Sequence, residues 1–557
     1  MFVILHRKRM KTIDTMKRIG LIIAVVALTM KAMACTNLIV GKRASADGSV
    51  MVTYNADDYG SYGYLHFYPA GAHPAGAMRA LYHYETNNYL GEIPEAAYTY
   101  GVVGQMNDQQ LTIMETTYGG REELVDATGL LDYGSLMYLT LQRAKTAREA
   151  IDVWVNLADT YGYQSEGESI TFADPNDVWV MDMIGRGPGV KGIVWVARRL
   201  PEDCITGHAN QARITTFPLK DKENCLYAKD VIKFAREKGY FTGKDADFSF
   251  REAYAPNDFG GRRICDARVW SFFNRCTAGM MRYLPYIQGI EDGTDELPWC
   301  VKPDQPVTLN ALKQAMRDHY ENTPLALTED IGCGPYEMPY RPTPLYFELD
   351  GVKYFNERPI STQQTAVTYI AQMRSWLPNH IGGVLWVGLD DANMVAYTPV
   401  YCSATEVPEC YSEGVANAFT YSAKSAYWLC NAVSNFVYPR YCQLFPELQS
   451  VRDELDKDFE GLLDKTDKEA QTMTTEEAVK HLTAYGCRAA SAMMDRWRGL
   501  FERLIVKYND MTVKPEENGQ YKRTAGGEHV PVIRPGYPER YRQQIIRQTG
   551  NRYKVPN

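Results

Sequence analysis

The sequence has few of the side chains and motifs that bind metals or nucleic acids. Only nine histidines occur among its 557 residues, and neither a C-x-x-C nor an H-E-x-x-H motif is present. We therefore expect no zinc site, and no other metal or cofactor. The formal net charge is −8, and the basic residues after the N-terminal segment do not cluster. An acidic chain of this kind argues against nucleic acids and anionic membranes as partners.

The apolar run near the N-terminus is too short to cross a membrane. Ile19–Met30 falls short of the roughly 20 residues that a spanning helix needs. Lys17 and Arg18 precede this run, and Ala32-Met33-Ala34 follows it as a small-x-small cleavage site. This order predicts a signal peptide over residues 1–34. We expect an exported protein, periplasmic or secreted, with no membrane insertion after cleavage.

Cleavage after Ala34 makes Cys35 the first residue of the mature chain, whether translation starts at Met1 or at Met16. An N-terminal cysteine carries an α-amine with a pKa of about 7.7–8.0 beside a thiol with a pKa of about 8.5. The amine can accept the thiol proton, as in N-terminal-nucleophile hydrolases. Two other interpretations stay open. Cys35 could be the acylated cysteine of a lipoprotein, although Ala32 replaces the usual large aliphatic residue, or an ordinary cysteine after the cleavage site.

Alternating hydrophobicity and turn residues predict several strands in antiparallel pairs. The segments are 35–40 and 50–55, 99–103 and 111–115, 169–173 and 178–184, with further strands at 193–198 and 382–389. Two helices are predicted within 130–162, separated by a capping box at Thr146–Glu149. Paired strands followed by paired helices indicate an α+β fold with stacked layers, rather than the βαβ alternation of a nucleotide-binding fold.

The composition changes near residue 446. Residues 447–508 are charged and helical, with a second capping box at Thr474–Glu477 and an apolar stripe that we expect to pack on the main body. Residues 510–557 contain many proline and arginine residues. We therefore predict a main domain over 35–445 and a helical extension and tail over 446–557.

Several blocks of the chain, in the same order, resemble bacterial dipeptidases of the dipeptidase A type. These enzymes are cysteine N-terminal-nucleophile hydrolases, distantly related to bile salt hydrolases, penicillin V acylases and acid ceramidase. The first block is CTNLIVGKRASADGSVMVTYNAD at 35–57, and the likeness continues to about Tyr441. The later blocks are 104–108 (GQMND), 173–179, 195–197, 207–214 (GHANQARI), 358–364 (RPISTQQ), 382–388 (GGVLWVG) and 425–428 (SAYW).

The resemblance implies a four-layer αββα sandwich and a set of catalytic residues. Cys35 matches the nucleophile, and Asp57 matches the acid that orients its amine. Asn107 matches the amide that stabilises the oxyanion, and Asn210 matches a second oxyanion or positioning amide. Arg268 matches a residue that holds the surroundings of the nucleophile. Asp57 and Asn107 also have a structural interpretation as turn residues, and Arg268 has one as part of a surface ion pair.

One position departs from the acyl-amidase relatives. They have an arginine just before the Asn-x-Asp sequence, where this chain has Tyr54. The arginine's role is therefore absent or supplied from elsewhere, and the difference favours the dipeptidase branch. The sequence thus predicts an exported cysteine dipeptidase that acts on small dipeptides through a thioester and assembles as a homo-oligomer, as related enzymes often do. The alternatives are an amidohydrolase of N-acyl amino acids or bile-acid conjugates, and a non-catalytic surface lipoprotein.

Overall fold

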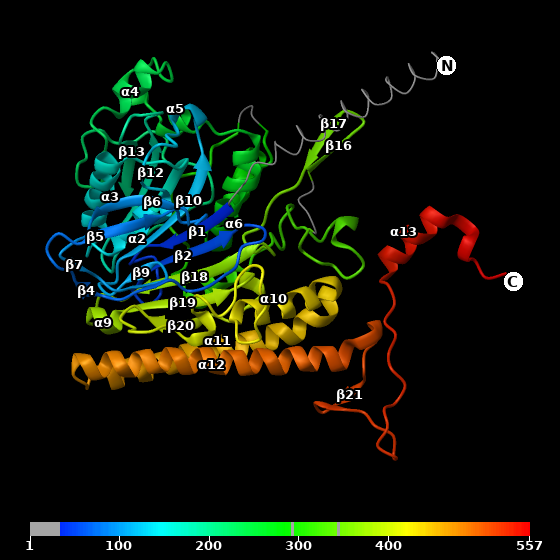
Figure 1. Cartoon of the computed structure of the whole chain (residues 1–557). Coiled ribbons are helices and arrows are strands. Elements are labelled where there is room, and N and C mark those ends of the chain that lie inside the picture. The colour runs from blue at the N-terminus through cyan, green and yellow to red at the C-terminus, as the bar shows by residue number, and fades with distance from the viewer. Residues whose placement is uncertain (1–33, 291–293, 342–345, 557) are drawn as a thin grey trace, which may run out of the picture.

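The computed structural model describes residues 34–290, 294–341 and 346–556 (Figure 1). The predicted signal peptide, apart from Ala34, lies outside the described residues, as do both candidate start residues, Met1 and Met16.

Two antiparallel sheets form the centre of the molecule. The first has the order β14-β1-β2-β18-β19-β20, with β14 Ile205–His208, β1 Ala34–Val40, β2 Val50–Asp57, β18 Thr365–Met373, β19 Gly383–Leu389 and β20 Thr398–Tyr401. The second has the order β15-β13-β12-β11-β10-β9-β8-β3, with β15 Cys225–Tyr227, β13 Ile193–Arg199, β12 Val178–Gly185, β11 Gly167–Ala173, β10 Thr112–Gly119, β9 Met106–Asn107, β8 Val102–Val103 and β3 Phe67–Tyr68.

Short hairpins and helices surround the two sheets. The two-stranded ribbons pair β4 Gly71–Ala72 with β7 Tyr98–Thr99, β5 Met78–Tyr82 with β6 Tyr89–Pro94, β16 Tyr346–Leu349 with β17 Val352–Phe355, and β21 Glu516–Glu517 with β22 Gln520–Tyr521. The α-helices are α2 Tyr133–Leu141, α3 Ala147–Tyr161, α4 Val231–Glu237, α5 Phe250–Tyr254, α6 Ala267–Cys276, α7 Leu284–Ile287, α8 Leu309–Met316, α9 Asn379–Gly382, α10 Ala426–Val437, α11 Tyr441–Ala470, α12 Thr475–Tyr508 and α13 Glu539–Thr549.

The two sheets contact each other through β1 and β2 on one side and β10 and β11 on the other. Helices α2 and α3 contact the eight-stranded sheet, while α10, α11 and α12 contact the β19–β20 end of the six-stranded sheet (Figure 1). The expectation of an α+β fold with large antiparallel sheets and a C-terminal helical region is therefore confirmed. Strands such as β18 and β19 are buried along their whole length because both of their faces are covered.

Side-chain caps define the helices that the sequence predicts. Thr146 accepts a hydrogen bond from the Glu149 amide at the start of α3, and Gly162 ends that helix with φ of +85°. Thr474 and Glu477 form a complete capping box at the start of α12. The apolar stripe of α12 packs on α10, α11 and β20, as predicted.

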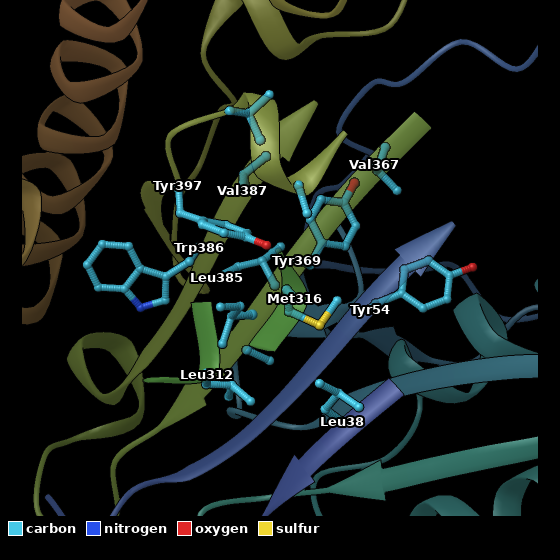
Figure 2. Packing of buried hydrophobic residues seen from close by; sticks show 14 of the residues in the cluster. Leu38, Tyr54, Leu312, Met316, Val367, Tyr369, Leu385, Trp386, Val387 and Tyr397 are labelled. Carbon is cyan, nitrogen blue, oxygen red and sulfur yellow. The ribbon is translucent and has the colours of Figure 1, made fainter. Parts of the chain in front are cut away.

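The largest hydrophobic cluster joins the six-stranded sheet to its neighbours. Figure 2 shows Leu38 and Tyr54 on β1 and β2, Tyr369 and Trp386 on β18 and β19, and Leu312 on α8 within this cluster. Cys35 belongs to the same cluster. Residue 446, where the sequence predicts a division, lies inside α11, which continues to Ala470.

Candidate active site

Cys35 lies near the start of β1 and is completely buried. On one side, the register with β2 places Cys35 opposite Ala56 and Ala34 opposite Asp57. On the other side, β14 pairs with β1 only from Asn37 onwards. The backbone on either side of the 34–35 peptide bond is thus paired with the end of β2, next to Asp57.

Asp57 is a buried carboxylate that is fully engaged. Its Oδ1 accepts a hydrogen bond from Thr365 Oγ1 at 2.5 Å, and its Oδ2 forms an ion pair with Arg358. Burial raises the pKa of Asp57, while Arg358, Thr365 and the more distant Arg268 oppose that rise. The resemblance left open where the missing arginine's role comes from. In the structure, Arg358 comes from the loop before β18 and forms an ion pair with Asp57, the acid of the Asn-x-Asp sequence that follows Tyr54.

The Cys35 thiol faces two polar side chains. Its Sγ lies 3.7 Å from Tyr54 Oη and 3.9 Å from Glu115 Oε1, and the Tyr54 hydroxyl donates a 2.8 Å hydrogen bond to that same oxygen of Glu115. Burial raises the pKa of the thiol well above its ordinary value, and the negative charges of Glu115 and Asp57 raise it further. The thiol is therefore protonated at neutral pH and needs a proton acceptor before it can act as a nucleophile.

Arg268, at the start of α6, is a buried cation that holds the backbone around the thiol. Its guanidinium donates to the carbonyl oxygen of Cys35 at 2.7 Å and to Thr36 Oγ1 at 2.8 Å. The same side chain donates to Ala209 O and to Asn210 Oδ1, both at 3.0 Å. The structure therefore places Arg268 in the interior, and the alternative of a surface ion pair is wrong.

Asn210 lies in the turn after β14, with a φ of +60°. Its Nδ2 donates a 2.7 Å hydrogen bond to Thr117 O on β10. The turn is fixed further on by Asp182, which accepts from the backbone amides of Arg213 and Ile214. Through Arg268, Asn210 is connected to Cys35.

The structure does not bring Asn107 into this group. Its Nδ2 donates to the carbonyls of Leu141 and Ala144 at 2.7 and 2.8 Å, and its Oδ1 accepts from the amides of Gln109 and Leu111. Both amide hydrogens are used to join the β9–β10 turn to the end of α2. This arrangement supports the interpretation of Asn107 as a turn residue.

Sequence reasoning missed three contributors to the site, namely Arg358, Thr365 and Glu115. Arg358 lies inside a block that resembles the dipeptidases, so the block carried a signal without indicating its partner. Thr365 is the first residue of β18, just after that block. Glu115 ends a predicted strand, and nothing in its neighbourhood distinguishes it from a solvent-facing acid.

No grouping of three or more His, Cys, Asp or Glu side chains suited to a metal ion occurs in the described ranges. Among the same residues, no helix is both long and apolar enough to cross a membrane.

Comparison with known proteins adds independent information. The sequence model of peptidase family C69 matches residues 34–68 and 66–454. A probable dipeptidase of Latilactobacillus sakei is 24% identical over 494 residues, which cover 85% of this chain and 95% of the relative. A probable dipeptidase of Salmonella dublin is 26% identical over 425 residues, covering 72% of this chain and 89% of the relative. Dipeptidase A of Lactobacillus helveticus is 23% identical over 514 residues, covering 87% and 99%.

Proposed function

The chain belongs to peptidase family C69, and on that premise we propose that it is an exported cysteine dipeptidase whose mature chain begins at Cys35. The names of its relatives favour dipeptides over acyl conjugates as substrates. The fold that we assign is the four-layer αββα sandwich of N-terminal-nucleophile hydrolases, with residues 446–557 as a helical extension and tail. We place the protein in the periplasm or the medium, and a homo-oligomer stays a prediction.

Removal of residues 1–34 would create the base that the site lacks. The new α-amine of Cys35 would lie where the strand register now places the 34–35 peptide bond, next to Asp57. The amine takes the proton of the thiol, and the thiolate attacks the carbonyl carbon of the dipeptide. The amine then passes this proton to the departing amino acid, leaving a thioester on Cys35. Water, deprotonated by the same amine, releases the second product and restores the thiol.

The remaining residues position the reacting groups. Asp57, held by Arg358 and Thr365, orients the α-amine, and Arg268 fixes the carbonyl of Cys35. Asn210 serves as the amide near the oxyanion, where one donor can be worth roughly 3–4 kcal/mol. We do not assign Asn107 this role, because both of its amide hydrogens bind backbone carbonyls.

One observation carries the proposal: the pairing of β1 with β2, together with Arg268, holds Cys35 and its carbonyl rigidly beside an acid that is already paired. A nucleophile on a fraying terminus could not be positioned in this way.

The test begins with the protein exported by its native host. Intact mass and N-terminal sequencing should show a free Cys35, and the mature protein should hydrolyse a panel of dipeptides faster than acyl-glycine conjugates. An acylated Cys35 would remove the base and favour the lipoprotein alternative. Preference for the acyl conjugates would make the protein an amidohydrolase instead.

A further inference from the structure

One buried glutamate lies beside the Cys35 thiol and a second lies next to the first, and the mechanism above uses neither of them. Glu115 on β10 and Glu168 on β11 are both fully inaccessible to solvent. Their strands are neighbours, with Glu115 paired to Ile170 and Glu168 paired to Thr117. The two carboxyl groups approach closely enough for one to hydrogen bond to the other when protonated.

One oxygen of each glutamate is held by the protein and the other is not. Glu115 Oε1 accepts from Tyr54 at 2.8 Å, and Glu168 Oε1 accepts from Thr117 Oγ1 at 2.9 Å. The Oε2 atoms of both residues are buried and have no hydrogen-bond donor among the described residues. No lysine or arginine of the described ranges pairs with either carboxylate.

Ionising this pair without a cation is costly, because buried carboxylates are normally paired or hydrogen bonded. Asp182, on the neighbouring strand, shows the usual solution, since its carboxylate accepts from Ser169 and from two backbone amides. Burial raises the pKa of Glu115 to about 7, and burial with the adjacent Glu115 charge raises that of Glu168 well above its ordinary range. A cation between the two would satisfy both free oxygens.

The distance to the thiol shows which cation fits. The carbonyl carbon of a substrate must come within about 3–3.5 Å of the attacking sulfur. In a dipeptide, the free α-nitrogen lies about 2.5 Å from that carbon, from the standard N–Cα and Cα–C bond lengths. Glu115 Oε1 is 3.9 Å from Cys35 Sγ, so this carboxyl group is within reach of an α-ammonium on the acyl side of the scissile bond.

We infer that Glu115 and Glu168 together bind the α-ammonium group of the substrate, so that the enzyme requires a free amino terminus on the residue it transfers to Cys35. This inference rests on the proposed function and adds a reason why unblocked dipeptides are selected over N-acyl compounds. An acylated substrate nitrogen carries no charge, and leaves the two glutamates buried without a counter-ion.

The test compares two substrates that differ only in the α-amine, alanyl-leucine and propionyl-leucine. The mature wild-type enzyme should favour alanyl-leucine in kcat/KM by about 100-fold or more, the usual scale for losing a buried charged partner. Glu115→Gln should reduce this preference to less than about 10-fold, by slowing alanyl-leucine far more than propionyl-leucine. Glu115→Asp, which keeps the charge, should restore part of the preference. Glu92→Gln is the matched control, because it removes one exposed charge from β6 and should leave the preference unchanged.

Other outcomes separate the possible failures. If Glu115→Gln slows both substrates equally, Glu115 acts on the thiol or on the fold, and the inference is overturned. If the wild type hydrolyses both substrates equally well, the inference fails while amide hydrolysis stands. If it hydrolyses neither and prefers other amides, the proposed function fails as well.

A binding measurement keeps the inference testable if the Glu115 variants do not fold. Mature-length protein with Cys35→Ala should bind alanyl-leucine and release protons near pH 7, because the ammonium displaces the proton held by the pair. The ionisable groups that interact with Glu115 are Glu168, Glu85, residue 35 itself and the tyrosines Tyr54, Tyr84, Tyr133 and Tyr163, and the thiol of residue 35 is absent from this variant. Binding of propionyl-leucine with equal affinity, or binding of alanyl-leucine without proton release, would overturn the inference.

Discussion

Asp57 and Glu115 are both buried carboxylates that influence the Cys35 thiol, yet their surroundings differ. Asp57 has a cation, Arg358, and a hydroxyl donor, Thr365, on its two oxygens. Glu115 has a hydroxyl donor on one oxygen. Its other oxygen lies near the carboxyl group of Glu168 and has no donor among the described residues. Asp57 is complete within the protein, whereas Glu115 needs a positive group from outside.

We interpret Asp57 as a permanent part of the catalytic site and Glu115 as part of a surface that binds the substrate. A paired buried charge keeps its geometry whether or not substrate is present, which suits a residue that orients the catalytic amine. An unpaired buried charge makes the free enzyme less stable and gives binding energy to a ligand of the opposite sign. Four predictions test this comparison.

Removing the proposed nucleophile should have the largest effect. Cys35→Ala in the mature protein should lower dipeptide turnover roughly a thousand-fold or more, because no covalent intermediate can form. The far-UV circular dichroism spectrum should match that of the wild type, since the substitution leaves the Asp57 and Glu115 side chains in place. Dipeptide hydrolysis at a rate near that of the wild type would contradict the mechanism.

Removing the charge of Asp57 should destabilise the fold and slow the reaction. Asp57→Asn takes the anion from Arg358, and loss of one partner of a buried pair costs about 3–5 kcal/mol. Denaturant unfolding should show this loss. Asp57→Asn combined with Arg358→Gln should lose less than the sum of the two single variants. Additive losses would mean that the pair is not coupled.

Neutralising Glu115 should stabilise the protein at alkaline pH. The pKa of Glu115 is about 7 in the folded protein, against an ordinary value of 4.5. The unfolded chain therefore loses this proton first, so the penalty grows between pH 4.5 and 7 and stays constant above that range. Glu115→Gln should raise the free energy of unfolding at pH 8 by up to roughly 3 kcal/mol, and by little at pH 4.5. Unfolding curves at the two pH values measure the difference, with Glu92→Gln as the control. An equal gain at both pH values would show that burial of the charge is not its cause.

Asn107 should behave as a structural residue and not as part of the catalytic site. Asn107→Ala leaves two carbonyls without donors and should cost about 2 kcal/mol of stability. Its effect on kcat should stay within about threefold when folded protein is assayed, whereas loss of an oxyanion donor costs about 100-fold or more. A large kcat effect would return Asn107 to the catalytic group.

Local pattern predicted the elements whose own sequence encodes their boundaries. The β11–β12 hairpin follows alternation around the Asp174–Asp177 turn, and the helices α3 and α12 follow their threonine caps. The segment 215–345 could not be interpreted because its helices are short: α4, α5 and α7 have seven, five and four residues, and α6 and α8 have ten and eight. Elements of that length are fixed by the surfaces they pack against rather than by periodicity.

The site was predicted only as far as resemblance reached. Cys35, Asp57, Asn210 and Arg268 were named in advance, and contacts of Arg268 connect it to both Cys35 and Asn210. The partners of Asp57 lie more than 300 positions further along the chain, so no local pattern joins them. Glu115 is buried because a second sheet covers β10, and that stacking cannot be deduced from one strand.

The guanidinium of Arg268 binds the backbone of β1 just beyond the point where its pairing with β14 ends. That pairing stops at Asn37, and the carbonyl of Cys35 is bound by an arginine side chain instead of a neighbouring strand. Cys35 is thus supported from both sides before any cleavage. If the leader is removed as we propose, one peptide bond breaks and the new terminus needs no refolding around it. We expect residue 35 of the proposed mature protein to be held as rigidly as a residue in the middle of a sheet.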